Sequence, residues 1–156
     1  MAKNIEKSSI ADMNANVMAL VAYLGGGVLA FIPGVRYFAW IVPVIILLIE
    51  KKSSLVKKSA AQSIVIQLIA TIVSFILYVI VYNIVLNSIT ANPWSILTGA
   101  ATGLSTVTTI AMVFSIAIGL VVIVASIKAY NNEYFKIPFV STIADKIEKL
   151  AAKIMK

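Results

Sequence analysis

The residues best placed to do chemistry are a set of polar side chains between positions 62 and 82. From Ser63 to Tyr82 they recur at steps of three or four residues, which places them on one helix face within an arc of about 100°. The set, called the polar seam below, consists of Gln62, Ser63, Gln67, Thr71, Ser74, Tyr78 and Tyr82. Such a seam has two interpretations. It either hydrogen-bonds to neighbouring helices, at about 0.6 kcal/mol per bond in membranes, or lines a hydrated cleft or pore.

The groups that enzymes and metal sites require are largely missing. The chain has no Cys and no His, so it lacks thiolate chemistry and the commonest acid/base group and metal ligand. A serine nucleophile would then need a lysine base, and no lysine lies within the apolar segments. The acidic residue nearest to an apolar segment is Glu50, at the end of one. The sequence therefore predicts no enzyme, no metal site and no cofactor, and it disfavours ion-coupled transport.

The polar seam belongs to a run without charge that extends from Ser59 to Ile127. A charge at mid-membrane costs roughly 2.5–3.5 kcal/mol on insertion scales, and a bilayer crossing takes about 20 apolar residues. The run is long enough for two crossings, joined at the turn-forming stretch from Asn87 to Trp94, where Pro93 cannot continue a helix. This predicts two long helices in lipid with the seam on the first of them.

The remaining segments complete an all-α fold, an integral membrane four-helix bundle with a C-terminal amphipathic interfacial helix. Ser9 and Asp12 have the spacing of a capping box at the start of the first helix. The second segment is short and holds Pro43, which predicts a kink and either a thin crossing or a re-entrant hairpin. The predicted helices are residues 10–32, 37–49, 60–86 and 102–128 in a domain 1–136, followed by a cytoplasmic tail helix in 137–156.

The tail helix is expected to lie on the membrane surface. Its apolar residues share one face and its lysines lie elsewhere, which suits an interface or, alternatively, a partner protein. The apolar face consists of Ile143, Ile147, Leu150, Ala151 and Ile154.

The distribution of charge predicts the orientation. The chain carries 13 Lys and Arg residues against 6 Asp and Glu. With four crossings, every basic residue except Arg36 falls on one side, which the positive-inside rule makes the cytoplasm. The sequence thus predicts a multi-pass protein of the cytoplasmic (inner) membrane with both termini cytoplasmic. The lipid bilayer accounts for the positive charge, so no nucleic-acid partner is expected.

A polar turn follows the fourth helix. Asn132 is predicted to cap that helix in a left-handed conformation, with aromatic anchors at headgroup depth and Glu133 paired to a lysine. A docking site is the alternative. The turn comprises Asn131, Asn132, Glu133, Tyr134, Phe135 and Pro138.

Several stretches together resemble a known family. They are residues 16–24, Phe31-Ile-Pro33, residues 41–52, the pair Gln62 and Gln67, and residues 127–138, which include the polar turn. In this order they resemble small prokaryotic membrane proteins grouped with the plastid import component Tic-twenty. The resemblance implies a four-helix membrane fold and a link to protein translocation. The chain departs from that family at Ser59, where a His is usual.

These observations favour a protein that acts by binding. The leading hypothesis is a non-enzymatic subunit, scaffold or accessory factor that works with a membrane-protein partner or as a homo-oligomer. The resemblance adds translocation to this hypothesis. The alternatives are an oligomeric channel lined by the polar seam and an immunity protein against a membrane-active peptide.

Overall fold

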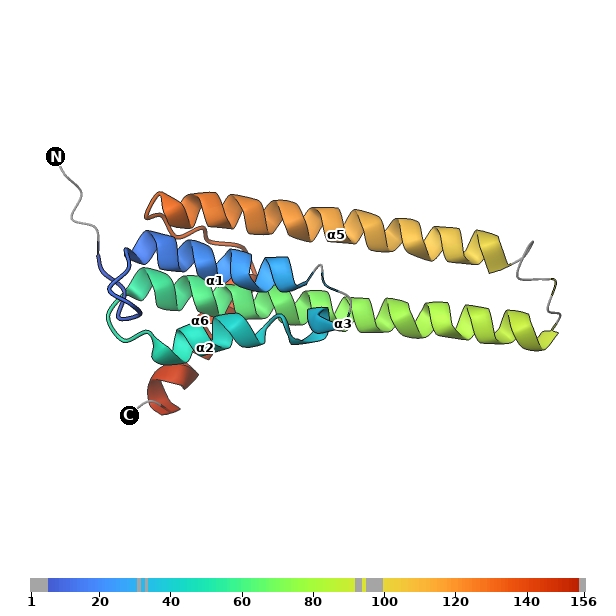
Figure 1. Cartoon of the computed structure of the whole chain (residues 1–156), viewed down its shortest axis with the longest axis horizontal. Helices are drawn as coiled ribbons and strands as arrows, with labels where there is room; N and C mark the ends of the chain where they lie inside the picture. The colour runs from blue at the N-terminus through green and yellow to red at the C-terminus, as the bar shows by residue number, and fades with distance from the viewer. Residues whose placement is uncertain (1–5, 31, 33, 92–93, 95–99, 155–156) are drawn as a thin grey trace. The chain divides into compact units, whose positions relative to one another are not determined.

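The computed structural model describes residues 6–30, 32, 34–91, 94 and 100–154. Within these residues the regular elements are helices, and the one β-bridge pairs Lys7 with Asn14. The all-α prediction is therefore confirmed. The elements are α1 (Ala15–Leu29), the 3-10 helix η1 (Val35–Phe38), α2 (Ile41–Ile49), α3 (Ser54–Ala91), α5 (Ala100–Tyr130) and α6 (Val140–Ile154) (Figure 1).

The chain forms two compact units. The first contains Met1–Leu68 and Gly119–Lys156, and the second contains Ile69–Ile118. In the first unit, α1 packs against α2, and α2 contacts α6. The second unit consists of one stretch each of α3 and α5 with the residues between them. The two helices are in van der Waals contact there, since a methyl group added at Gly103 would lie 3.6 Å from Ile84 Cγ2. The core of apolar and polar side chains lies in the first unit, because its short helices bury the N-terminal part of α3.

Two helices have the length and composition of membrane spans. Among the described residues these are Ser54–Thr90 and Gly103–Tyr130. The 38 residues of α3 correspond to roughly 57 Å at 1.5 Å per residue, well above a bilayer core of about 30 Å. The 15 residues of α1 and the 9 of α2 give only about 22 and 14 Å. A membrane bundle thus has support, whereas four full crossings do not follow from these lengths.

The first helix begins later than predicted. Ser9 and Asp12 do not form a capping box, because α1 starts at Ala15. Ala11 and Asp12 instead have positive φ angles of 53° and 56°, so residues before α1 turn back on themselves. Ser9 is engaged with Glu50, far along the chain, and that contact replaces the local cap.

The second predicted helix, residues 37–49, is divided. It comprises η1 and the shorter α2, which meet near Trp40. Pro43 is the third residue of α2, and the helix continues past it to Ile49, because the first turn of a helix has no intrahelical partner for that N–H. The indole Nε1 of Trp40 donates to the carbonyl of Tyr37 at 2.8 Å and bridges the two pieces.

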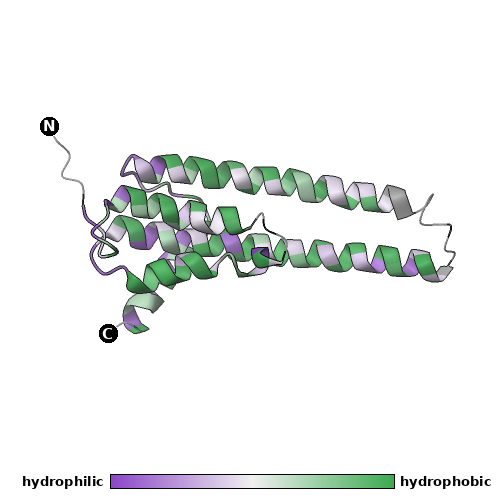
Figure 2. Cartoon of the chain, viewed as in Figure 1, coloured by the Kyte–Doolittle hydropathy of each residue, from purple (hydrophilic) through white to green (hydrophobic). Residues whose placement is uncertain are grey.

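The two long helices extend beyond their predicted limits of 60–86 and 102–128 at both ends. α3 begins at Ser54 because Ser53 caps it, and α5 continues to Tyr130. The predicted connector reaches into residues 92–93, which lie outside the described residues. Hydrophilic residues gather before α1 and between α2 and α3, whereas the long helices are mostly apolar (Figure 2).

Candidate functional site

A buried carboxylate joins the N-terminal segment to the start of α3. Glu50 is fully buried and accepts hydrogen bonds from the Ser8 and Ser9 hydroxyls and the Ser9 backbone N–H. The backbone N–H groups of Lys52 and Ser53 also donate to Oε1, at 2.8 and 2.9 Å. We call these residues the Glu50 cluster. Its position before α3 suits a negative charge, since the helix N-terminus carries partial positive charge.

The hydrogen bonds keep this carboxylate ionised. Burial by itself raises the pKa of Glu50, but the bonds from Ser8, Ser53 and Ser9 outweigh it and lower the pKa to about 2. Ser53 extends the cluster, because its hydroxyl donates to Glu6 Oε2 at 3.0 Å. The cluster therefore fastens the chain before α1 to the loop before α3.

A second buried group, Gln62, joins three segments. Its Oε1 accepts a 2.5 Å hydrogen bond from the Tyr23 hydroxyl of α1, and its Nε2 donates to the carbonyl of Phe135 at 3.0 Å. Nearby, the side-chain amide of Asn16 donates to the carbonyl of Tyr130 at 3.0 Å. These contacts hold the polar turn after α5 against α1 and α3.

The polar turn adopts the predicted cap. Asn132 has a φ of 60°, its N–H donates to the carbonyl of Ala129, and the N–H of Glu133 donates to that of Lys128. This is the Schellman pattern of a helix C-terminus. Glu133 also pairs with Lys128 at 2.7 Å, which confirms the predicted lysine partner. Both charged side chains are about half exposed, so the pair adds little stability.

Tyr134 leads from this turn toward α6. Lys58 Nζ lies 5.9 Å from the centre of its ring, a cation–π contact. Burial raises the pKa of Tyr134 to about 12, with further contributions from the negative charges of Asp145 and Glu148. Its hydroxyl is buried and has no hydrogen-bond partner among the described residues. Phe135 supplies the carbonyl to Gln62, while Asn131 and Pro138 are exposed.

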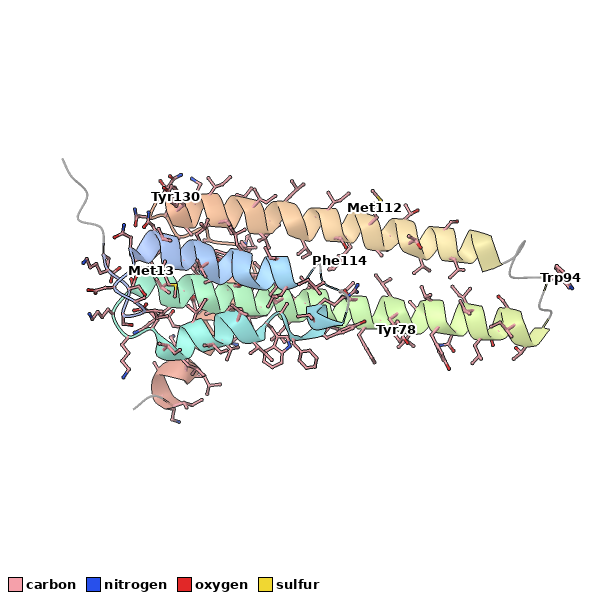
Figure 3. The ribbon with its side chains drawn as sticks, in the orientation of Figure 1. Met13, Tyr78, Trp94, Met112, Phe114 and Tyr130 are labelled. Atoms are coloured by element: carbon pink, nitrogen blue, oxygen red, sulfur yellow. The ribbon has the colours of Figure 1, made fainter. Side chains whose placement is uncertain are left out.

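The polar seam does not share one environment. Gln62, Ser63 and Gln67 are buried in the first unit. Thr71 and Ser74 are partly exposed. The rings of Tyr78 and Tyr82 stack on each other, and the two residues are 58% and 56% exposed. Figure 3 labels Tyr78 on α3. For Gln62 the structure shows the hydrogen-bonding interpretation. The pore interpretation of the seam stays a prediction.

Close helix contacts surround Gly25, Gly26 and Gly27 in α1. A methyl group added at Gly26 would lie 3.2 Å from Gln67 of α3 and from the carbonyl oxygen of Ala39. One at Gly25 would lie 3.1 Å from Val42 of α2. The glycines therefore serve helix packing, as expected for small residues in membrane helices.

A surface pocket of about 360 Å³ lies beside α6. It is lined by Lys58, Asp145, Glu148, Lys149 and Ala152, and we call it the α6 pocket. Sequence reasoning did not predict it, because Lys58 is far from α6 along the chain. The Glu50 cluster and Tyr23 were also missed. The available signal for Glu50 was a carboxylate at the end of an apolar segment, close to Ser53 and Ser54.

The buried polar groups of the first unit hydrogen-bond to other parts of the chain. The acceptors of Glu50 and Gln62 are occupied by groups of the chain itself. No cluster of three or more His, Cys, Asp or Glu that would suit a metal ion occurs among the described residues. Of the features described above, the α6 pocket alone brings together side chains of opposite charge that form no ion pair within 4.0 Å.

Comparison with known proteins corrects the resemblance drawn from the sequence. Residues 14–144 match the sequence model of the magnetosome magnetite crystal formation protein family. No curated protein and no solved structure matches the chain. The Tic-twenty-like assignment is therefore wrong, since most of the stretches on which it rested are apolar runs with Pro and Gln that unrelated small membrane proteins also contain. Because the match covers most of its length, the chain belongs to the magnetosome magnetite crystal formation protein family.

Proposed function

We propose that this protein is a non-enzymatic accessory factor of a membrane in which magnetite crystals form. The observation that carries the proposal is the family match over residues 14–144, on a chain with two apolar helices of membrane-spanning length. Translocation, which rested on the corrected resemblance, is not part of it. The protein acts by binding, to a membrane-protein partner or to a second copy of itself.

The contacts of the first unit support a topology with both termini on the cytoplasmic side. Ser9 bonds to Glu50, so the chain before α1 and the chain after α2 lie together, whether or not these short helices cross the bilayer. Gln62 bonds to Phe135, which places the start of α3 beside the end of α5. Except for Arg36, the basic residues in the described part of the chain then share one membrane face, as the positive-inside rule expects of a cytoplasmic face.

The exposure of α6 supports a position along the membrane surface. Its small residues Ala144 and Ala151 are buried against the rest of the first unit. Leu150 and Ile154 are 59% and 70% exposed, although both are apolar. Much of the predicted apolar face of α6 is thus not covered by other parts of the chain. Insertion of this face among acyl chains, with lysines at the phosphates, removes it from water.

Complementation tests the proposed function. A magnetosome-forming bacterium that lacks its own member of the family receives this chain, and crystal size and number are measured by electron microscopy. We expect crystals closer to those of the parent strain. A Gln62→Leu variant, which still inserts into the membrane but lacks the hydrogen bonds to Tyr23 and Phe135, serves as the control for dependence on the fold. A wild-type chain that is present in the membrane and leaves the crystals unchanged contradicts the proposal.

A further inference from the structure

The α6 pocket combines charges of both signs in one concave site. Lys58 comes from the first turns of α3, and Asp145, Glu148 and Lys149 come from α6. Its volume of about 360 Å³ is far above the roughly 10–15 Å³ that a single water requires. This is enough room for a small polar group, and both elements belong to the first unit.

The four charges are not neutralised by one another. The ion pair within 4.0 Å that the described part of the chain shows is Lys128 with Glu133, outside the pocket. Asp145 and Glu148 are nevertheless partly buried, and their negative charge reaches the hydroxyl of Tyr134. Lys58 and Lys149 are exposed, so the pocket presents charges of both signs, not paired with one another, to a ligand that carries both.

The sign pattern selects the class of ligand. An anion alone would meet Asp145 and Glu148, and a metal cation alone would meet Lys58 and Lys149. A dipolar ion satisfies both pairs. We propose that the α6 pocket binds the phosphoethanolamine group of a membrane phospholipid, with its phosphate at the lysines and its ammonium at the carboxylates. The lipid source rests on the proposed position of α6 at the membrane surface, which brings its polar face to headgroup level.

Two details favour a primary ammonium over a quaternary one. The carboxylates of Asp145 and Glu148 accept hydrogen bonds, which an ethanolamine ammonium donates and a choline group cannot. The Tyr134 ring is already in cation–π contact with Lys58, which lines the pocket. That contact also holds the lysine ammonium at one wall of the site.

Native mass spectrometry of the full-length protein tests the proposal. The protein is equilibrated with equimolar phosphatidylethanolamine, phosphatidylcholine and phosphatidylglycerol in detergent, and the retained lipid is counted. Loss of a charge-assisted hydrogen bond is worth roughly 1.5–3 kcal/mol, so we expect phosphatidylethanolamine to be retained at least about tenfold over the other two. Equal retention of the three lipids overturns the proposal.

Matched variants locate the site. Lys149→Gln and Glu148→Gln should each reduce the preference about tenfold. Lys153→Gln makes the same charge change as Lys149→Gln on the same helix but outside the pocket, and should retain the wild-type preference. Equal losses in the two lysine variants indicate a general charge effect and overturn the site. Circular dichroism confirms that each variant keeps its helices.

Two further measurements separate the sources of the ligand. Soluble glycerophosphoethanolamine should displace the lipid only at much higher concentration, and tighter binding of the soluble compound overturns the lipid source. Binding of Mn²⁺ that is lost in Glu148→Gln and kept in Lys149→Gln identifies a metal site and overturns the proposal. If lipid preference is absent while Leu150 still contacts acyl chains, this inference fails and the proposed position of α6 stands.

Discussion

Replacing Glu50 by glutamine should loosen the junction between the N-terminal segment and α3. The amide keeps one acceptor oxygen but turns an NH₂ group toward hydroxyls and N–H groups that are themselves donors. The pKa of Glu50 is lowered from an ordinary 4.5 to about 2. At about 1.4 kcal/mol per pKa unit, this difference corresponds to roughly 3 to 4 kcal/mol of folding stability.

The same linkage predicts how the effect depends on pH. Above the ordinary pKa of 4.5, Glu50 is charged in both the folded and the unfolded protein, and its contribution is fully present. As the pH falls toward about 2, the unfolded state binds the proton first and the contribution disappears. Wild type should thus be more stable than Glu50→Gln near neutral pH, and the two should converge on acidification.

Reversible unfolding in mixed detergent micelles measures this difference at a series of pH values. Hydrogen exchange at the Ser9 and Ser53 amides adds a local measurement, because both N–H groups donate to Glu50. Asp12→Asn provides the matched control, since Asp12 is exposed and a left-handed φ suits asparagine. Equal stability of wild type and Glu50→Gln near neutral pH, or a difference that persists in acid, would refute the reasoning.

Three more predictions concern packing and position. In a double-mutant cycle of Gln62→Leu with Tyr23→Phe, unfolding should give a coupling of about 0.6–1.7 kcal/mol, and additivity would contradict the 2.5 Å bond. Gly26→Ala should lower the melting temperature by overpacking worth about 1–3 kcal/mol, whereas Gly119→Ala, with nothing within 4 Å, should not, and similar shifts would contradict the close contact. A fluorophore on a cysteine replacing Leu150 should be quenched by lipid-borne quenchers, and quenching only by aqueous iodide would contradict the surface position of α6.

Local features of the fold could be predicted because neighbouring residues determine them. The helical class follows from the charge-free run, the left-handed cap follows from Asn132 at the end of a helix, and Glu133 has a lysine within reach. The limits of α1 and α2 were missed where a distant contact overrides the local signal. Ser9 looked like a cap, but its partner Glu50 is 41 residues away.

The candidate site was predicted only in part, for the same reason. Gln62 was named for its helical spacing, but the spacing does not reveal its bond to Phe135, 73 residues away. Lys58, like Gln62, belongs to α3, yet it reaches α6 by tertiary packing alone. Periodicity identifies the face of a helix, and only the packing of the other helices decides what that face meets.

The three consecutive glycines of α1 define how that helix is oriented about its own axis. Successive residues on a helix point about 100° apart, so Gly25, Gly26 and Gly27 face different directions, toward Val42, Gln67 and Val122. Turning α1 by a single residue would bring Leu24 to the position of Gly25, where even a methyl group would lie only 3.1 Å from Val42. The close contacts at Gly25 and Gly26 therefore favour the present orientation of α1 over one that is rotated by a residue.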